Sequence, residues 1–274
     1  MADSVLVDYF RQYSRWFILT GAGISTASGI PHYRDRNGQW MHSQPIQFQA
    51  FVNQQSVYKR YWARSAIGWK SFQKARFNQS HRLLAQLESM DKISIIVTQN
   101  VDGLHQKAGS TSAINLHGNL DHARCLSCDT LHPRESIQDQ IMSDNPALNL
   151  INARPLPDGD AWLVDFDFDN FHPPACHLCD GRLKPDVVFF GENVPRQRVD
   201  TCFSHLASSD ALMIIGSSLM VYSGLRFVRA AHDRGLPIVA INDGITRADD
   251  LLDYKVESDC ADTLLELITE LCDD

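Results

Sequence analysis

The sequence lacks a run of apolar residues long enough to cross a bilayer. Of its 274 residues 44% are hydrophobic, but no continuous apolar segment reaches the roughly 18 residues that a membrane helix needs. The first segment, MADSVLVDYFRQYSRW, has no basic stretch followed by an apolar core, and Asp3 and Asp8 interrupt it. Neither a secretory signal nor a transit peptide is therefore indicated. We expect a cytoplasmic protein that does not enter membranes.

Acidic residues are missing from one long segment. The net charge of −8 argues against general nucleic-acid binding, yet no Asp or Glu lies between Asn37 and Leu87. The basic residues of this segment are Lys59, Arg60, Arg64, Lys70, Lys74, Arg76 and Arg82. Two interpretations stay open: a solvated basic helix face, or a positive lip beside a site for anionic ligands or acidic partners.

One glycine is missing from a loop near the start of the chain. The apolar run 16–19 predicts a buried strand, and Gly21 and Gly23 follow it. Thr26 then stands where the dinucleotide-binding pattern GxGxxG needs its last glycine. Glycines let backbone N–H groups approach phosphate. A tight structural turn explains two glycines about as well, so the loop alone decides nothing.

Other apolar strands end in small or polar residues in the same way. The pattern predicts further strands at 93–97, 113–116, 187–190, 211–215 and 237–241 and helices at 3–13, 46–75, 80–90, 196–208, 223–234 and 261–272. Such alternation indicates a parallel, doubly wound sheet. Four strands end in TGAG, TQNVD, GSS and NDG, and ligands bind beyond the carboxyl ends of such strands. Together these ends predict a nucleotide site.

Seven cysteines form an odd set, which argues for a metal rather than for disulfides. The pairs Cys125-x-x-Cys128 and Cys176-x-x-Cys179 are 47 residues apart. Two such turns can place four thiolates around one zinc ion, and a closed four-ligand site is structural. A redox CxxC pair is the weaker interpretation. Three nearby histidines could replace a thiolate: His122, His172 and His177.

These features predict an α/β fold: a Rossmann-like doubly wound parallel sheet with an inserted small zinc-binding module and a helical insertion. We expect the Rossmann-like domain at 1–40, 76–120 and 185–274. The helical insertion would span 41–75 and the zinc-binding module 121–184.

Seven motifs in order along about 15–262 resemble the sirtuins, the NAD-dependent protein lysine deacylases. The motifs are GAGISTASGIPHYR, TQNVDGLH, LHGN, the paired CxxC turns, KPDVVFFGE, GSSLMVYSG and IND. Three segments resemble class II sirtuins, particularly the mitochondrial type associated with lipoamidase and ADP-ribosyltransferase activity. They are YWARSAIGW at 61–69, PDGD at 157–160 and KPDVVFFGE.

The resemblance implies a set of residues that bind NAD. The set is Gly21, Ala22, Gly23, Ser25, Ile30, Tyr33, Arg34, Gln99, Asn100, Asp102, Gly216, Ser217, Ser218, Asn242, Asp243, Gly244 and Cys260. The glycine loop, Ser25 and the two later serines would hold the pyrophosphate. Asn242, Asp243 and Cys260 would face the adenosine. Ile30, Asn100 and Asp102 would hold the nicotinamide amide.

The resemblance also implies the chemistry. His117 would be the general base, with Asn100 and Asp102 as further catalytic residues, because an imidazole that titrates near neutrality can take a proton from a ribose hydroxyl. The acyl-lysine oxygen would attack the ribose C1′ and displace nicotinamide. The products would be free lysine, nicotinamide and O-acyl-ADP-ribose.

Acylated protein lysines are the implied partners of what we expect to be a monomer that binds neither nucleic acid nor membranes. The substrate peptide would bind as an added strand. Two segments would sandwich it, and their residues are Val188, Phe189, Phe190, Gly191, Leu219 and Val221.

Two departures and two other functions stay open. His32 stands where the family usually has an acidic residue. Tyr61-x-x-Arg64 matches the spacing by which some class II sirtuins bind acidic acyl groups, although the flanking residues resemble the lipoamidase type. The other functions are protein mono-ADP-ribosyltransferase and non-catalytic NAD-sensing adaptor. A dehydrogenase is disfavoured, because the acid expected about 20 residues past the glycine loop is missing.

Overall fold

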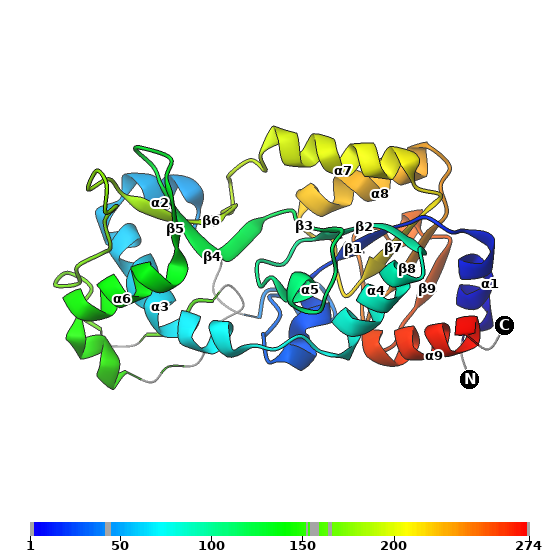
Figure 1. Cartoon of the computed structure of the whole chain (residues 1–274), viewed down its shortest axis with the longest axis horizontal. Helices are drawn as coiled ribbons and strands as arrows, with labels where there is room; N and C mark the ends of the chain where they lie inside the picture. Colours follow the sequence, from blue (N-terminus) through cyan, green and yellow to red (C-terminus); the bar gives the residue numbers. More distant parts are fainter. Residues whose placement is uncertain (1–2, 42–44, 152, 154–158, 164–165, 273–274) are drawn as a thin grey trace.

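The chain forms two sheets that lie in separate lobes. Figure 1 shows the computed structural model, which describes residues 3–41, 45–151, 153, 159–163 and 166–272. Within these residues, a six-stranded sheet forms the centre of one lobe and a three-stranded sheet belongs to the other. No helix in the described part of the chain is both long enough and apolar enough to span a membrane.

The larger sheet is parallel throughout and confirms the predicted doubly wound fold. Its strands follow the order β3 (Ala113–Asn115), β2 (Ile93–Thr98), β1 (Trp16–Thr20), β7 (Ala211–Ile215), β8 (Ile238–Ile241) and β9 (Tyr254–Val256). The chain builds outward from β1 to β3, then crosses back and builds outward from β7. The order therefore reverses between β1 and β7, the place where such sheets bind ligands.

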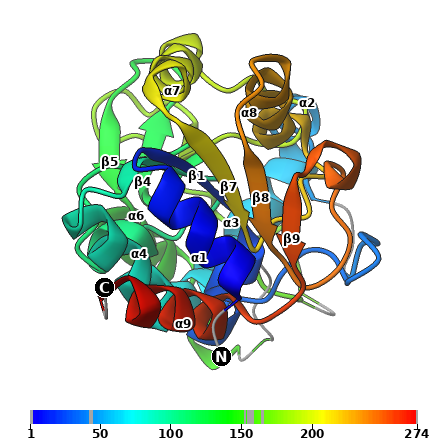
Figure 2. The same cartoon turned by 90° about the vertical axis from the view of Figure 1, so that its right-hand side faces the viewer.

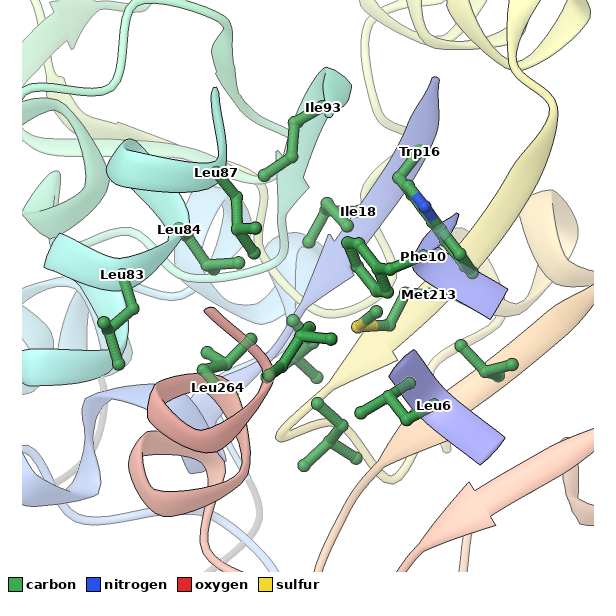
Figure 3. Packing of buried hydrophobic residues seen from close by; sticks show 14 of the residues in the cluster. Leu6, Phe10, Trp16, Ile18, Leu83, Leu84, Leu87, Ile93, Met213 and Leu264 are labelled. Atoms are coloured by element: carbon green, nitrogen blue, oxygen red, sulfur yellow. The ribbon is translucent and has the colours of Figure 1, made fainter. Parts of the chain in front are cut away.

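Helices cover both faces of this sheet (Figure 2). One face carries α1 (Ser4–Gln12), α4 (Gln79–Ser89) and α9 (Cys260–Cys272), and the other carries α7 (Arg196–Ser208) and α8 (Tyr222–Asp233). Side chains of β1 alternate between the two faces, since Trp16 and Ile18 join the first core and Phe17 and Leu19 the second. Figure 3 shows the first core, in which Phe10 of α1 stacks on Trp16.

The smaller lobe combines the predicted helical insertion with the cysteine-rich segment. Its antiparallel sheet has the order β5 (Leu131–Pro133), β4 (Gly118–Cys125) and β6 (Leu183–Val187). Around it lie α2 (Phe48–Asn53), α3 (Gln55–Lys74) and α6 (Arg134–Asp144). Trp62 of α3, Ile137 of α6 and Cys176 belong to one buried cluster, so both insertions share a single core.

The remaining described elements are short. They are η1 (Ala22–Ser28), α5 (Leu104–Lys107), η2 (Pro146–Leu150) and η3 (Asp249–Leu251).

The strand predicted at 187–190 is wrong. Strand β6 ends at Val187 and pairs with β4 in the smaller sheet, and of the following residues only Phe190 forms an isolated bridge, to Gln47. Phe189 instead packs against Phe51, with ring centroids 4.8 Å apart. The apolar residues that follow β6 therefore pack against α2 and do not join the large sheet.

Two histidines are buried together beneath the end of β1. The rings of His81 in α4 and His105 in α5 meet edge to face, with centroids 4.9 Å apart. His105 Nε2 lies 3.0 Å from Thr20 Oγ1. Burial lowers the pKa of His81 to about 4 and the pKa of His105 to about 3. Both imidazoles are therefore neutral in the folded protein at pH 7.

These depressed pKa values predict acid lability. In the unfolded chain His81 has its ordinary pKa of about 6.5, so between pH 6.5 and 4 it binds a proton when unfolded but not when folded. The contribution of neutral His81 to stability is therefore present above pH 6.5 and is lost as the pH falls toward 4. The loss for His81 is roughly 3 kcal/mol. His81→Leu should flatten the pH dependence of the free energy of urea unfolding between pH 7 and 4. The exposed-residue variant His232→Gln should follow the wild type, and equal slopes for all three proteins would contradict the prediction.

Candidate functional site

A cavity of about 1210 Å³ lies at the carboxyl ends of β1, β2, β7 and β8 and takes walls from both lobes. Nearly all residues predicted to bind NAD or peptide, or to act in catalysis, line it. They are Gly21, Ala22, Gly23, Ser25, Ile30, Tyr33, Arg34, Gln99, Asn100, Asp102, His117, Val188, Phe189, Phe190, Gly191, Gly216, Ser217, Ser218, Leu219, Val221, Asn242, Asp243 and Cys260. Folding thus brings together motifs that lie far apart in the sequence.

Gly244 is the one predicted residue that does not line the cavity. Its φ is +108°, and a Cβ there would lie 2.5 Å from the backbone oxygen of Arg36. Its own oxygen accepts a 2.9 Å hydrogen bond from Asn242 Nδ2. Gly244 therefore supports the cavity wall by permitting a close backbone approach.

The loops that follow β1 and β7 cross in direct contact. The N–H of Gly23 donates to the oxygen of Gly216 at 2.8 Å. A Cβ at Gly21 would lie 2.7 Å from the Ser217 side chain, and one at Gly23 would lie 2.8 Å from the Gly216 oxygen. Both positions consequently require glycine, whatever the spacing of the sequence motif.

Three polar side chains behind this crossing hold one another in place. Asn100 Nδ2 donates to the oxygen of Gly21 and to Ser25 Oγ, each at 3.0 Å, and Ser25 Oγ donates to Asp102 Oδ2 at 2.7 Å. Asp102 also accepts from the N–H of Leu104 at 2.9 Å. Burial raises the pKa of the Asp102 carboxyl, and these hydrogen bonds oppose the rise. The network fixes the cavity floor between β1 and β2.

His117 is held in a single tautomer. Its Nδ1 lies 2.8 Å from the backbone oxygen of Gln99, and because a carbonyl only accepts, Nδ1 carries the hydrogen and Nε2 keeps its lone pair. Burial lowers the pKa of His117 to about 4, and the nearby charges of Arg198 and Arg226 act in the same direction. The expectation of a histidine that titrates near neutrality is therefore wrong for the free protein: the imidazole is neutral at pH 7.

Ser223 is a site residue that the sequence reasoning missed. Its Oγ lies 2.7 Å from His117 Nε2, and because Nε2 carries no hydrogen, the serine hydroxyl donates. Ser223 lies in the first turn of α8, within the quoted motif GSSLMVYSG. Its place in this motif was the one sign in the sequence that Ser223 could belong to the site. Only the packing of α8 against β7 and β8, with its first turn at the cavity, brings the hydroxyl to the imidazole.

The segment Tyr33–Arg34 forms part of the wall through stacking. The guanidinium of Arg34 lies 3.8 Å from the centre of the Trp40 ring, and its Nη1 donates to the oxygen of Gly38 at 2.7 Å. His32 also lines the cavity. The contacts of Arg34 thus hold the end of the motif GAGISTASGIPHYR against Trp40 and Gly38.

Tyr61 and Arg64 of α3 have different environments. Tyr61 lines the cavity, and Arg64 does not. Arg64 forms a 2.9 Å ion pair with the largely buried Asp160 and donates through Nε to the oxygen of Ala161 at 2.9 Å. Asp160 belongs to the segment PDGD, whose first two residues, Pro157 and Asp158, lie outside the described part of the chain.

The four predicted metal ligands converge in the smaller lobe. Sulfurs of Cys125, Cys128, Cys176 and Cys179 all lie within 4.8 Å of one another. The distance between Cys125 and Cys179 is 3.5 Å and that between Cys128 and Cys176 is 3.7 Å. A zinc tetrahedron with Zn–S bonds of about 2.3 Å has edges of about 3.8 Å. The donor set therefore fits one zinc ion.

Both cysteine turns have the same backbone geometry. Asp129 and Asp180 follow the second cysteine of each pair with φ of +61° and +56°. The N–H of Asp129 bonds the oxygen of Cys125 at 3.1 Å, and that of Asp180 bonds the oxygen of Cys176 at 2.9 Å. The module thus presents two matched knuckles to one point.

The chain is similar to known proteins over most of its length. The family model described as "Sir2 family" matches residues 21–223. An "NAD-dependent protein deacetylase" of Xanthomonas campestris pv. campestris is 54% identical over 259 residues, covering 94% of this chain and 88% of the relative. "NAD-dependent protein deacetylase 2" of Bradyrhizobium diazoefficiens is 52% identical and covers 98% of both chains.

The chain belongs to the Sir2 family.

Solved sirtuin structures agree over the whole fold. A Sir2 complex with a p53 peptide and NAD⁺ has a TM-score of 0.77 at 27% identity and covers 100% of both chains. A Sir2 variant with a deacetylated p53 peptide and 3′-O-acetyl ADP-ribose has a TM-score of 0.80 at 28% identity and covers 98% of both. This sirtuin is an NAD-dependent protein deacetylase that acts on acetylated protein or peptide substrates, and its four-cysteine cluster is consistent with structural zinc.

Removing zinc should unfold the smaller lobe of this sirtuin. Cys125 and Cys176 are buried in the same cluster as Trp62, so loss of the metal exposes part of that core. We expect one zinc per chain by elemental analysis. A strong chelator, or Cys128→Ser, should change the tryptophan fluorescence of the lobe and release the zinc.

The matched control is Cys272→Ser, which removes an exposed thiol outside the cluster. It should keep the zinc and the fluorescence of the wild type. A well-folded protein that contains no zinc would contradict the prediction.

Proposed function

We propose that His117 is the general base of the deacylation reaction. The observation that carries this role is the fixed tautomer of a buried, cavity-lining imidazole, whose Nδ1 donates to Gln99 and whose Nε2 is left as the acceptor, at present toward Ser223. A base must be unprotonated and within reach of the proton that it takes. The low pKa of His117, about 4, keeps it unprotonated at neutral pH.

NAD fits the residues that line the cavity. The crossing of Gly21 and Gly23 against Gly216 leaves no room for a Cβ, and such glycine loops let backbone N–H groups approach phosphate. We propose that this crossing, with Ser25, Ser217 and Ser218, holds the pyrophosphate. When bound, NAD supplies the ribose C1′ that accepts the acyl oxygen as nicotinamide leaves.

The two ends of the dinucleotide would then lie on either side of this crossing. We assign the adenosine to Asn242, Asp243 and Cys260, and the nicotinamide amide to Ile30, Asn100 and Asp102. Asn100 is suited to this role, because its amide is oriented by the oxygen of Gly21 and by Ser25. The two amide N–H groups are used in these contacts, so the Asn100 side-chain oxygen is left as a preorganised acceptor, which costs little to align when the ligand binds.

The acylated peptide would lie between 188–191 and 219–221, with the acyl-lysine pointing toward His117. The segment 188–191 is anchored at both ends, since the N–H of Val188 donates to the oxygen of His117 at 2.7 Å and the oxygen of Phe190 accepts from Phe48 at 2.8 Å. On the other side, Leu219 is buried with a φ of +54°. Extended peptides bind such segments through backbone hydrogen bonds.

The finer classification rests on resemblance. We propose that this sirtuin is of class II and similar to the mitochondrial lipoamidase and ADP-ribosyltransferase type. The support is the segment YWARSAIGW, in which Gly68 lets the backbone of Asp160 approach α3 closely. We also propose that the Rossmann-like domain spans 1–40, 76–120 and 185–274, the helical insertion 41–75 and the zinc-binding module 121–184.

We further propose that the enzyme is a cytoplasmic monomer that does not bind nucleic acid or membranes. Among the described residues none of the seven cysteines forms a disulfide, which agrees with a reducing compartment. The net charge is −8.

Replacing His117 tests the proposed base. His117→Ala should lower kcat/KM for an acetyl-lysine peptide by about 10²- to 10⁴-fold, the usual contribution of a general base. Because the pKa of His117 is about 4, wild-type kcat/KM should not fall between pH 8 and 6 through this group. His232→Gln is the control. A variant with wild-type activity would overturn the assignment.

The labelled product separates the two enzymatic activities. With NAD that is labelled in the adenosine moiety, the proposed reaction yields free O-acyl-ADP-ribose. Label that becomes bound to protein would support mono-ADP-ribosyl transfer instead.

Arg64 should not select acidic acyl groups. Arg64 does not line the cavity, and its ion pair with Asp160 already neutralises its charge. Arg64→Gln should lower the melting temperature, because it leaves Asp160 without its charged partner. The ratio of kcat/KM for succinyl-lysine to acetyl-lysine peptides should stay within about twofold, since the guanidinium makes no substrate contact. A selective loss of succinyl activity would show that Arg64 reads the acyl carboxylate.

A further inference from the structure

Three arginines line the cavity, and two of them are engaged by the protein. Arg34 stacks on Trp40 and donates to the oxygen of Gly38. Arg36 forms a 2.7 Å ion pair with Asp243. Arg226 is the third, and within the described residues it has neither a hydrogen-bond acceptor nor a carboxylate partner.

Arg226 is partly buried, and its surroundings leave its charge uncompensated. Its Nε is buried and has no hydrogen-bond partner among the described residues. The guanidinium carbon lies 5.4 Å from the centre of the Tyr222 ring, a contact that cannot replace an anion. A buried donor without a partner is costly, and a ligand that supplies an acceptor removes the cost.

The carboxylates of the cavity wall are engaged elsewhere. Several of them form ion pairs: Asp160 with Arg64, Glu192 with Lys184, Asp243 with Arg36 and Glu257 with Lys255. The others bond hydroxyl or backbone N–H groups: Asp35 with Gln39, Asp102 with Ser25 and Asp259 with Ala261. Among the described residues, none of these groups is available to Arg226.

Arg226 lies on the same side of the cavity as the proposed base. It follows Ser223 by three residues in α8, so both side chains project from one helix face. Ser223 Oγ is 2.7 Å from His117 Nε2. The charge of Arg226 also contributes to the low pKa of His117, which agrees with this placement.

We propose that Arg226 binds a carboxylate of the substrate close to the reacting lysine. The guanidinium fork matches a carboxylate in shape and charge. The inference rests on the proposed function of the cavity and deepens it, because it names an anionic class of acyl-lysine substrate. The carboxylate can belong to the end of a dicarboxylic acyl group or to an acidic side chain next to the lysine.

A panel of peptides separates these two sources. The reference is acetyl-lysine in a neutral peptide. The first arm carries succinyl- or glutaryl-lysine in the same peptide, and the second carries acetyl-lysine flanked by glutamates. Arg226→Gln should lower the ratio of kcat/KM for one arm to the reference by about 10- to 100-fold, the effect of losing a charge-assisted hydrogen bond. The arm whose kcat/KM ratio falls identifies the source of the carboxylate.

Arg229→Gln is the matched control, because Arg229 lies one turn away near the same Tyr222 ring but does not line the cavity. Its ratios should equal those of the wild type, and Arg226→Lys should restore part of the lost ratio. Equal ratios for Arg226→Gln and wild type would overturn the inference. A raised KM for NAD with unchanged ratios would do so as well, by assigning Arg226 to phosphate.

The failure of this inference can be distinguished from the failure of the proposed function. If wild type deacetylates the reference peptide and depends on His117, the proposed function holds whatever Arg226 does. If wild type acts on no peptide of the panel, the proposed function fails first. The thermal melting temperature of each variant excludes loss of folding as the cause.

Discussion

The site depends on the crossing of two backbones at the point where the strand order of the sheet reverses. The N–H of Gly23 and the oxygen of Gly216 meet at 2.8 Å, and neither Gly21 nor Gly23 has space for a Cβ. This contact holds the ends of β1 and β7 together. Asn100 and Ser25 are then oriented by the same loop, so a backbone approach fixes the polar groups around it.

Burial controls the ionisation of the residues that surround this crossing. It lowers the pKa of His117 and raises that of Asp102, and in both cases the neutral form gains. Hydrogen bonds act differently on the two groups. The backbone oxygen of Gln99 fixes the tautomer of His117, whereas Ser25 and the N–H of Leu104 favour the carboxylate form of Asp102. The cavity thus presents oriented dipoles and few free charges, which makes the single uncompensated guanidinium of Arg226 conspicuous.

Much of the fold could be predicted because the signals are local. The strand at 16–19, the glycine loop and the two cysteine turns each follow from a few neighbouring residues. The prediction failed at 187–190, where an apolar run packs around Phe51 instead of joining the large sheet. Short strand β9 and polar helix α6 went unpredicted, because their sequences carry little hydrophobic periodicity.

The sequence by itself determined the family, many of the residues that line the cavity and the four cysteines, because these are properties of motifs with fixed spacing. Only the tertiary structure decided which charges are free. Arg64 and Arg226 are alike as residues, yet one meets Asp160 and the other meets no acid in the described chain. The same holds for the low pKa of His117 and its contact with Ser223. Such properties depend on burial and on neighbours far away in the sequence, which spacing does not encode.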